Sequence, residues 1–152
     1  MTGQAFLVPR RSLLYMPGAN PRAMEKAQSL DCDTIIFDLE DAVAASVKSQ
    51  ARSQVLAALT HNTYGHRELV VRCNGLDTPW GMDDLRCFAD APIGALLFPK
   101  IESTAQIREI KDALASHGSP LPVWIMIETP TAVLNLQHFA ADPRITALVM
   151  GT

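Results

Sequence analysis

Short apolar runs alternate with segments of helical periodicity along the whole chain. Each run is four or five residues long and apolar on both faces, which is typical of parallel strands covered by helices. The alternation predicts one sheet of about six parallel strands. The expected strands are residues 12–16, 34–37, 68–71, 95–98, 123–127 and 147–150.

The connecting segments place apolar residues three or four positions apart, as one face of a helix does. Asn20 is expected to cap a helix whose first residue is Pro21. Ser103 and Gln106 have the spacing of a capping box ahead of a later helix. The stripes expected to face the sheet are Ala23, Met24, Ala27 and Leu30; Val47, Ala51, Val55 and Leu59; Met82, Leu85 and Phe88; Ile107, Ile110 and Leu114; and Val133, Leu136 and Ala140.

Regular alternation of strands and helices indicates an α/β fold with a parallel sheet. Both a (β/α)8 barrel and an open doubly wound sheet are compatible with this pattern. The turn after the first strand, "YMPGANP", lacks the glycine spacing of a dinucleotide-binding or phosphate-binding loop. The doubly wound alternative is therefore disfavoured.

A charged residue follows four consecutive apolar runs: Asp38, Arg72, Lys100 and Glu128. The carboxyl ends of successive parallel strands meet at one edge of a sheet, where ligands bind in both open α/β sheets and barrels. We therefore expect two carboxylates and two cations to converge there. Such a set can neutralise itself, or hold a metal ion and an anionic substrate.

The four charges are not equally informative. Glu128 follows "VWIMI" directly and has few polar neighbours in the sequence. Burying such a carboxylate costs free energy unless it is paired or binds a metal. Arg72 follows "LVV", where a guanidinium requires a carboxylate or an anionic ligand. For Lys100, the favoured interpretation is a solvent-directed side chain beside Glu102.

The carboxylates of "DLED", which are Asp38, Glu40 and Asp41, have an alternative interpretation. They can serve as loop residues or as capping residues for the helix that follows. The sequence leaves this choice open.

Composition narrows the class of protein. The chain is 48% hydrophobic and 19% charged, as in ordinary globular proteins. A net charge of −3 gives no electrostatic basis for binding nucleic acid or an anionic membrane. No apolar run approaches the roughly 20 residues that span a bilayer. Cys32, Cys73 and Cys87 are odd in number and lack a CxxC spacing, which predicts reduced thiols in a cytoplasmic protein.

Five segments occur in order: "RRSLLYMPGANPRAMEKA", "DTIIFDLEDAV", "VRCNGLDTPWG", "LLFPKIES" and "IMIETPTAVLN". Together they resemble the citrate lyase beta subunit family, within the HpcH/HpaI aldolases that include malyl-CoA and citramalyl-CoA lyases. The resemblance extends from Arg10 to Thr152. It implies a (β/α)8 TIM barrel, here an incomplete barrel of about six parallel strands. Residues 1–152 would form the N-terminal portion of a single lyase domain.

The resemblance also implies an activity. Family members use Mg²⁺ to cleave a C–C bond of a 3-hydroxyacyl-CoA reversibly, giving acetyl-CoA and a 2-oxo acid. The expected substrate is of the citryl-CoA type, with oxaloacetate as the 2-oxo acid. Malyl-CoA and citramalyl-CoA lyases are the alternatives within the class. A truncated, non-catalytic paralogue acting as a binding or assembly module is the alternative from another class.

Five residues match functional positions of the family. Glu128 matches a magnesium ligand that also contacts substrate. Arg72 matches the catalytic cation that stabilises charge on substrate oxygens. Tyr15, Arg22 and Lys26 match residues that line the acyl-CoA entrance. Arg22 and Lys26 are four apart on one helix face, where ordinary solvated side chains are equally compatible with the spacing.

The length differs from that of a full barrel, which takes about 250 residues. The family's second magnesium ligand and its general base would lie beyond Thr152. The chain is therefore expected to be either a fragment of a longer protein or a natural truncation. An incomplete barrel exposes the edge of its last strand, so association into a homo-oligomer is also expected.

Overall fold

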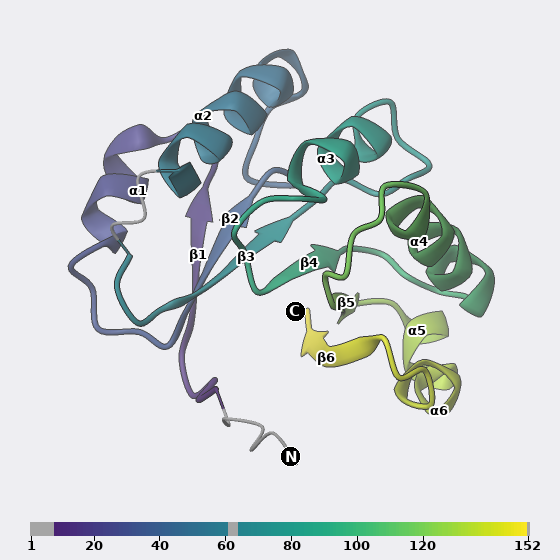
Figure 1. The fold of residues 1–152 in the computed structure, drawn as a ribbon. Helices are drawn as coiled ribbons and strands as arrows, with labels where there is room; N and C mark the ends of the chain where they lie inside the picture. The colour runs from purple at the N-terminus through teal and green to yellow at the C-terminus, as the bar shows by residue number, and fades with distance from the viewer. Residues whose placement is uncertain (1–7, 61–63, 152) are drawn as a thin grey trace.

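The computed structural model describes residues 8–60 and 64–151, which form one six-stranded parallel sheet (Figure 1). The strands are β1 (Leu13–Pro17), β2 (Thr34–Asp38), β3 (Glu68–Arg72), β4 (Ala95–Phe98), β5 (Val123–Ile127) and β6 (Ile145–Met150). The six apolar runs are all strands, with ends that differ from the expected ones by at most two residues. The prediction of an α/β fold with six parallel strands is confirmed.

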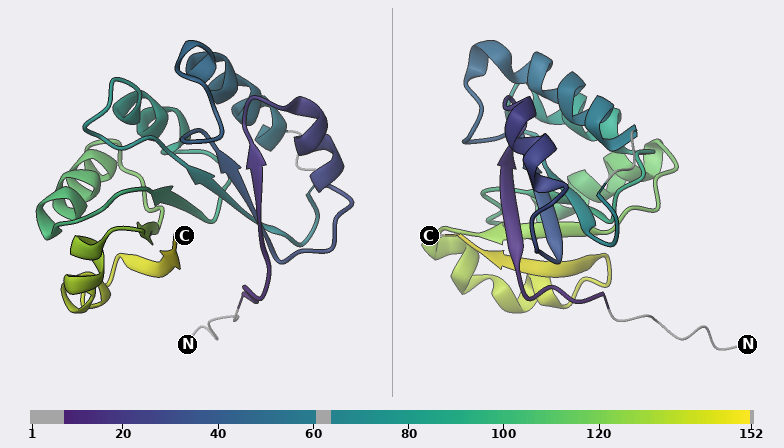
Figure 2. Two further views of the ribbon diagram at one scale, coloured as in Figure 1. Left: turned by 180° about the vertical axis from the view of Figure 1, so that it is seen from behind. Right: turned by 90° about the vertical axis from the view of Figure 1, so that its left-hand side faces the viewer.

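Strand order separates the two architectures that the sequence allowed. The strands follow one another as β1-β2-β3-β4-β5-β6, and the helices lie along the outer side of the curved sheet (Figures 1 and 2). A doubly wound sheet would reverse its strand order at a switch point and carry helices on both faces. The described residues therefore form part of a barrel wall that does not close, and the doubly wound alternative was wrong.

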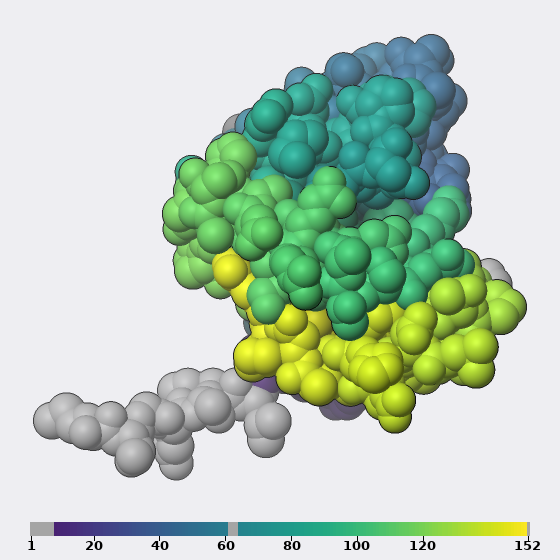
Figure 3. All heavy atoms as spheres, turned by 90° about the vertical axis from the view of Figure 1, so that its right-hand side faces the viewer, coloured from purple at the N-terminus to yellow at the C-terminus, as the bar shows by residue number. Residues whose placement is uncertain are grey.

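The helices follow the strands in turn and form the outer layer, part of which Figure 3 shows as a continuous surface from teal to yellow-green. They are α1 (Pro21–Ala27), the 3-10 helix η1 (Ala45–Val47), α2 (Lys48–Thr60), α3 (Gly81–Phe88), α4 (Thr104–Ser116), α5 (Pro130–Leu134) and α6 (Leu136–Ala140). Both expected caps are confirmed. The Asn20 side chain accepts from the Ala23 N–H at 3.1 Å, and Ser103 and Gln106 form the reciprocal capping box.

Strand side chains divide into two apolar layers. Outward-facing residues such as Phe37, Val71 and Ile125 join the helices in the main core. The inner face carries a thinner layer, which consists of Ile36, Val70, Ala95, Leu97, Trp124 and Met126. Because β2, β4 and β5 are buried along their whole length, both faces must be apolar.

The expected apolar stripe of Val133, Leu136 and Ala140 was wrong for Val133 and Ala140, whereas Leu136 packs against the core. Ala132 and Phe139 are the buried residues, whereas Val133 is 49% exposed. The segment is broken at Asn135 into α5 and α6, and the Asn135 side chain donates to the Glu102 carbonyl at 2.9 Å. This contact with another part of the chain shifts the helical phase, which a local pattern does not reveal.

Within the described residues, β1 and β6 each pair with a single neighbouring strand. Leu148 and Met150 on β6 are 37% and 65% exposed. The three cysteines are free thiols, as expected. None of the helices in the described part of the chain is long and apolar enough to cross a bilayer.

Candidate active site at the carboxyl rim of the sheet

Asp38 and Arg72 end neighbouring strands in direct register. Arg72 Nε donates to Asp38 Oδ1 at 2.8 Å, and Nη2 donates to Oδ2 at 2.5 Å. Both residues are buried. The guanidinium at the end of β3 therefore has the carboxylate that its position requires, in the two-pronged geometry that only arginine provides.

Asp38 also shapes the loop after β2. Its carboxylate accepts from the backbone N–H groups of Glu40 at 2.8 Å and Ala42 at 3.2 Å. The following helix begins at Ala45 after Ala44, with no side-chain cap. Asp38, the last residue of β2, thus holds the loop in place, and none of the "DLED" carboxylates caps the helix that begins at Ala45.

Arg72 Nη1 points away from Asp38. It lies 3.2 Å from Glu40 Oε2 and 3.5 Å from the sulfur of Met126. The guanidinium carbon is 5.2 Å from the centre of the Tyr15 ring, a cation–π distance. Burial lowers the pKa of Arg72, but its hydrogen bonds to Asp38 and the negative charges of Asp38 and Glu40 together more than offset this, so the pKa is raised and the group remains a cation.

Lys100 connects the end of β4 to the charges on both sides. Its backbone N–H donates to Glu128 Oε1 at 2.6 Å, and its ammonium contacts Glu40 Oε1 at 2.5 Å and Asp41 Oδ1 at 3.4 Å. Its backbone has φ of 52°, a left-handed conformation that costs a residue with a side chain about 1 kcal/mol or more. The expectation of a solvated side chain beside Glu102 was wrong about its partner, although the side chain is 58% exposed.

Glu128 follows β5 directly and is partly exposed. Among the described residues, its Oε1 accepts the Lys100 N–H, whereas Oε2 accepts no hydrogen bond. The backbone passes close by at Gly151, where an added Cβ would lie 2.6 Å from the Cβ of Glu128 and 3.2 Å from Oε2. A glycine is therefore required there for the end of β6 to lie against this carboxylate.

These groups surround a cleft of about 310 Å³. It is lined by Tyr15, Asp41, Arg72, Met126, Glu128, Met150 and Gly151. The structure thus brings together Tyr15, Arg72 and Glu128. Arg22 and Lys26 are exposed on α1 and are not among the lining residues.

Tyr15 is a neutral group in this cleft. Burial raises the pKa of its phenol, the Arg72 cation lowers it, and Asp38 raises it further, with a net rise. Its hydroxyl lies 3.8 Å from the Met126 sulfur, which is a weak acceptor. The phenol O–H is therefore available to a ligand as a donor.

We call the charged groups at this edge the rim cluster, which consists of Asp38, Glu40, Asp41, Arg72, Lys100 and Glu128. It contains four carboxylates and two cations. The nearby ammonium of Lys48 is buried behind the loop, where it donates to the backbone carbonyls of Leu39 and Glu40. Of the rim cluster, Asp41, Arg72 and Glu128 line the cleft, so two carboxylates and one cation face it.

The donors present fit Mg²⁺. Magnesium prefers hard oxygen ligands and is typically bound by one or two protein carboxylates, with waters and substrate oxygens completing its octahedron. Glu128 offers a carboxylate oxygen that no described residue occupies. Among residues 8–60 and 64–151, no group of three or more His, Cys, Asp or Glu is placed to hold a metal ion by itself.

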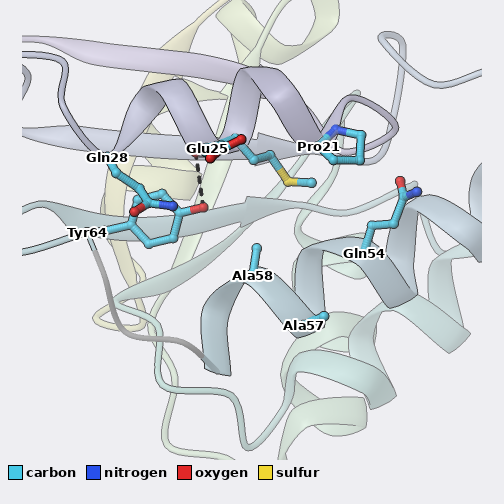
Figure 4. A pocket seen from close by; sticks show the side chains of 8 residues that line it. Pro21, Glu25, Gln28, Gln54, Ala57, Ala58 and Tyr64 are labelled. Carbon is cyan, nitrogen blue, oxygen red and sulfur yellow. Dashed lines mark hydrogen bonds between the residues drawn. The ribbon is translucent and has the colours of Figure 1, made fainter.

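A second pocket of about 310 Å³ lies on the outer side, between α1 and α2 (Figure 4). Its lining includes Met24, Gln54, Ala58 and Tyr64, and the Tyr64 hydroxyl donates to the Met24 carbonyl at 3.3 Å. Glu25 is its one ionisable carboxylate among the described residues. Despite its equal size it lacks the opposed charges of the rim cleft, which is the better candidate for chemistry.

Comparison with known proteins identifies the lineage. The profile of the family described as HpcH/HpaI aldolase/citrate lyase matches residues 11–152. The chain belongs to this family.

Two curated relatives with different names are similar to the chain. The (3S)-malyl-CoA thioesterase of Cereibacter sphaeroides (strain ATCC 17029 / ATH 2.4.9) is 49% identical over 144 residues, which cover 95% of this chain and 49% of the relative. The citrate lyase subunit beta of Leuconostoc mesenteroides subsp. cremoris is 38% identical, with coverage of 93% and 50%. The chain thus spans about half the length of the curated relatives it matches.

A solved structure supports the same assignment. The citrate lyase beta subunit from M. tuberculosis, complexed with oxaloacetate and magnesium, superposes with a TM-score of 0.75 at 28% identity. The match covers 93% of this chain and 59% of that chain. The family resemblance inferred from the motifs is confirmed, and so is the fold that it implied.

Three site features were not predicted from the sequence. They are the fork between Arg72 and Asp38, the bridge from Lys100 to Glu40, and the close approach of Gly151. The strand-end spacing placed the charges of the fork and of the bridge on one edge of the sheet. It did not show which of these charges are in contact. Gly151 follows an apolar run, and a glycine there was the one available signal of a tight approach.

Proposed function

We propose that the protein takes part in Mg²⁺-dependent cleavage of a C–C bond in a 3-hydroxyacyl-CoA, giving acetyl-CoA and a 2-oxo acid. The observation that carries this proposal is the cleft in which a fixed guanidinium and a carboxylate with an open oxygen face the same space. Members of the HpcH/HpaI family include acyl-CoA lyases, and a magnesium-and-oxaloacetate complex is known for one structural neighbour.

Arg72 is the proposed catalytic cation. As the bond breaks, negative charge develops on oxygens of the 2-oxo acid and of the thioester enolate. Asp38 fixes the guanidinium with two hydrogen bonds, so Nη1, which lies beside Glu40 and Met126, is oriented before substrate arrives. A donor that is already oriented stabilises developing charge without reorganising.

Glu128 is the proposed magnesium ligand. The Lys100 N–H restrains one of its oxygens, and the other accepts no hydrogen bond from the described residues. Magnesium bound there would act as a Lewis acid toward oxygens of the 2-oxo acid. The surplus of carboxylates in the rim cluster favours a divalent cation at this edge.

The acyl-CoA arm is proposed to enter beside α1. Tyr15 lines the cleft, and exposed Arg22 and Lys26 lie on the helix that follows it. Two solvated cations four residues apart can attract the phosphates of coenzyme A at the cost of little desolvation. Their role is binding, not chemistry.

Hydrolysis of a malyl-CoA thioester is a second candidate. It is favoured by the 49% identity to a relative named (3S)-malyl-CoA thioesterase. Both reactions start from a 3-hydroxyacyl-CoA with a free carboxylate, so the same cation and metal ligand can bind either substrate. The reactions differ in the bond broken and hence in the products.

One assay separates the candidates. Purified protein is incubated with Mg²⁺ and with citryl-CoA, malyl-CoA or citramalyl-CoA in turn. A lyase releases a 2-oxo acid, detected as its phenylhydrazone, together with an acyl-CoA. A thioesterase releases free coenzyme A, detected with a thiol reagent, and no 2-oxo acid. If no substrate yields a 2-oxo acid or free coenzyme A, either with Mg²⁺ or after its removal by EDTA, the result would favour a non-catalytic binding or assembly module.

We also propose a homo-oligomer in the cytoplasm. The free thiols of the described residues support a reducing compartment. Sedimentation of the purified protein tests the first, and cell fractionation tests the second.

A further inference from the structure

Lys100 occupies a conformation that its residue type disfavours. Its φ of 52° makes it the one non-glycine residue with positive φ in the described part of the chain. Glycine would adopt this backbone freely, so a side chain here calls for an explanation. The contacts of the backbone and of the side chain must each be considered.

The ammonium of Lys100 lies on a chain of charges that ends at Arg72. It contacts Glu40 Oε1, and the other oxygen of Glu40 lies 3.2 Å from Arg72 Nη1. Glu40 is buried and therefore poorly hydrated, so its charge requires partners. Lys100 contacts one of its oxygens, and Arg72 Nη1 and the Asp41 backbone N–H contact the other, so the two cations share one carboxylate.

This sharing concerns the one guanidinium nitrogen of Arg72, a cleft-lining residue, that forms no hydrogen bond to Asp38. Nε and Nη2 are committed to Asp38, which leaves Nη1 for an anionic ligand. Without the ammonium of Lys100, Arg72 would be the one cation left in a salt bridge with Glu40 among the described residues, and Glu40 would hold Nη1 more tightly. An incoming carboxylate would then have to displace Glu40 and would also meet a more negative rim.

We propose that Lys100 is a positioning residue that neutralises Glu40 and thereby keeps Arg72 Nη1 available to an anionic 2-oxo acid. The inference rests on the proposed function, since it assumes that Arg72 binds this product. It assigns the ammonium to anion binding and the backbone N–H to orientation of Glu128. The two ends of one residue therefore act on different ligands.

This division of roles between the ammonium and the backbone N–H predicts different effects on the dissociation constants for oxaloacetate and for Mg²⁺. Lys100→Met removes the charge but keeps the backbone N–H that contacts Glu128. Its dissociation constant for oxaloacetate, measured by calorimetry with saturating Mg²⁺, is expected to rise about fivefold, the upper range for a partly exposed ion pair. Its dissociation constant for Mg²⁺ alone is expected to stay the same or fall, because the rim becomes more negative.

Two further variants sharpen the test. Lys111→Met is the matched control, because Lys111 pairs with Asp142 on the outer side at 2.7 Å and should change neither constant. Glu40→Gln removes the competitor, so adding Lys100→Met to it should change oxaloacetate binding less than twofold. A larger change in that background would mean that Lys100 does not act through Glu40, and would overturn the proposal.

The remaining outcomes also decide the matter. If the wild-type protein binds oxaloacetate and Lys100→Met has the same dissociation constant for it, this inference is overturned and the proposed function is left intact. An equal rise in the dissociation constants for oxaloacetate and for Mg²⁺ would indicate a general loss of local structure and would also overturn this inference. Failure of the wild-type protein to bind any 2-oxo acid with Mg²⁺ would reject the proposed function and this inference together.

Discussion

The two ends of the sheet carry the same local motif. At the carboxyl end, Arg72 grips Asp38 with two hydrogen bonds. At the amino end, Arg10 Nε donates to Glu68 Oε2 at 2.6 Å and Nη2 donates to Oε1 at 2.8 Å. The Arg10 guanidinium lies 4.8 Å from the centre of the Trp124 ring. An arginine fork beside an aromatic ring is therefore not by itself a sign of function.

The ends differ in charge balance. We call Arg10, Arg11, Asp33 and Glu68 the base cluster, in which two cations are paired with two carboxylates. In the rim cluster two cations face four carboxylates, and one oxygen of Glu128 accepts no hydrogen bond from the described residues. A balanced cluster stabilises the end of the sheet. A cluster with surplus carboxylates around a cleft is suited to bind a cation.

The largest effect is expected from removing the metal ligand. Glu128→Gln should raise the dissociation constant for Mg²⁺ by about 10²-fold or more, since even groups that only orient a ligand change metal affinity by about 10- to 100-fold. Metal-dependent turnover should be abolished while circular dichroism is unchanged. Wild-type Mg²⁺ affinity in this variant would remove Glu128 from the site.

Exchanging arginine for lysine at both ends tests the comparison directly. Arg72→Lys preserves charge but loses the fork, and should lower kcat/KM by about 10²-fold, the usual scale for one oxyanion donor. Arg10→Lys should leave kcat/KM within about twofold and lower the free energy of unfolding by about 1 kcal/mol. Near-normal turnover by Arg72→Lys would make both forks structural.

A smaller effect is expected where charges are solvated. The double variant Arg22→Ala with Lys26→Ala should raise the KM for acyl-CoA several-fold, with a smaller change in kcat. This pattern reports binding energy that the ground state and the transition state share. Steady-state kinetics with the best substrate provides the measurement, and a loss confined to kcat would place these residues in the chemistry instead.

The smallest effect concerns pH and the base cluster. Side-chain and backbone hydrogen bonds from Arg11 hold the pKa of Asp33 well below its usual range. A carboxyl with a depressed pKa stabilises the fold above its unfolded pKa near 4, and that contribution is lost as pH falls. Asp33→Asn should therefore be less stable than wild type at pH 7, with the difference narrowing toward pH 3 in urea denaturation. A gap that stayed constant with pH would show that Asp33 stabilises the fold without its charge.

Local signals were sufficient for much of the fold. The strands followed from short runs that are apolar on both faces, because a parallel sheet is covered on one side by helices and lined on the other by its own inner layer. The caps at Asn20 and Ser103 were predictable because each involves groups within three residues. The break at Asn135 was not, because its partner is the carbonyl of Glu102, 33 residues away.

The sequence by itself determined the family, the parallel strands and the edge at which Asp38, Arg72, Lys100 and Glu128 gather. Only the tertiary structure decided which of these charges touch. Arg72 and Asp38 are 34 residues apart, and their pairing depends on strand register. The reason is physical: periodicity fixes the face and the end of an element, whereas hydrogen bonds between distant charges depend on distances that only the folded sheet sets.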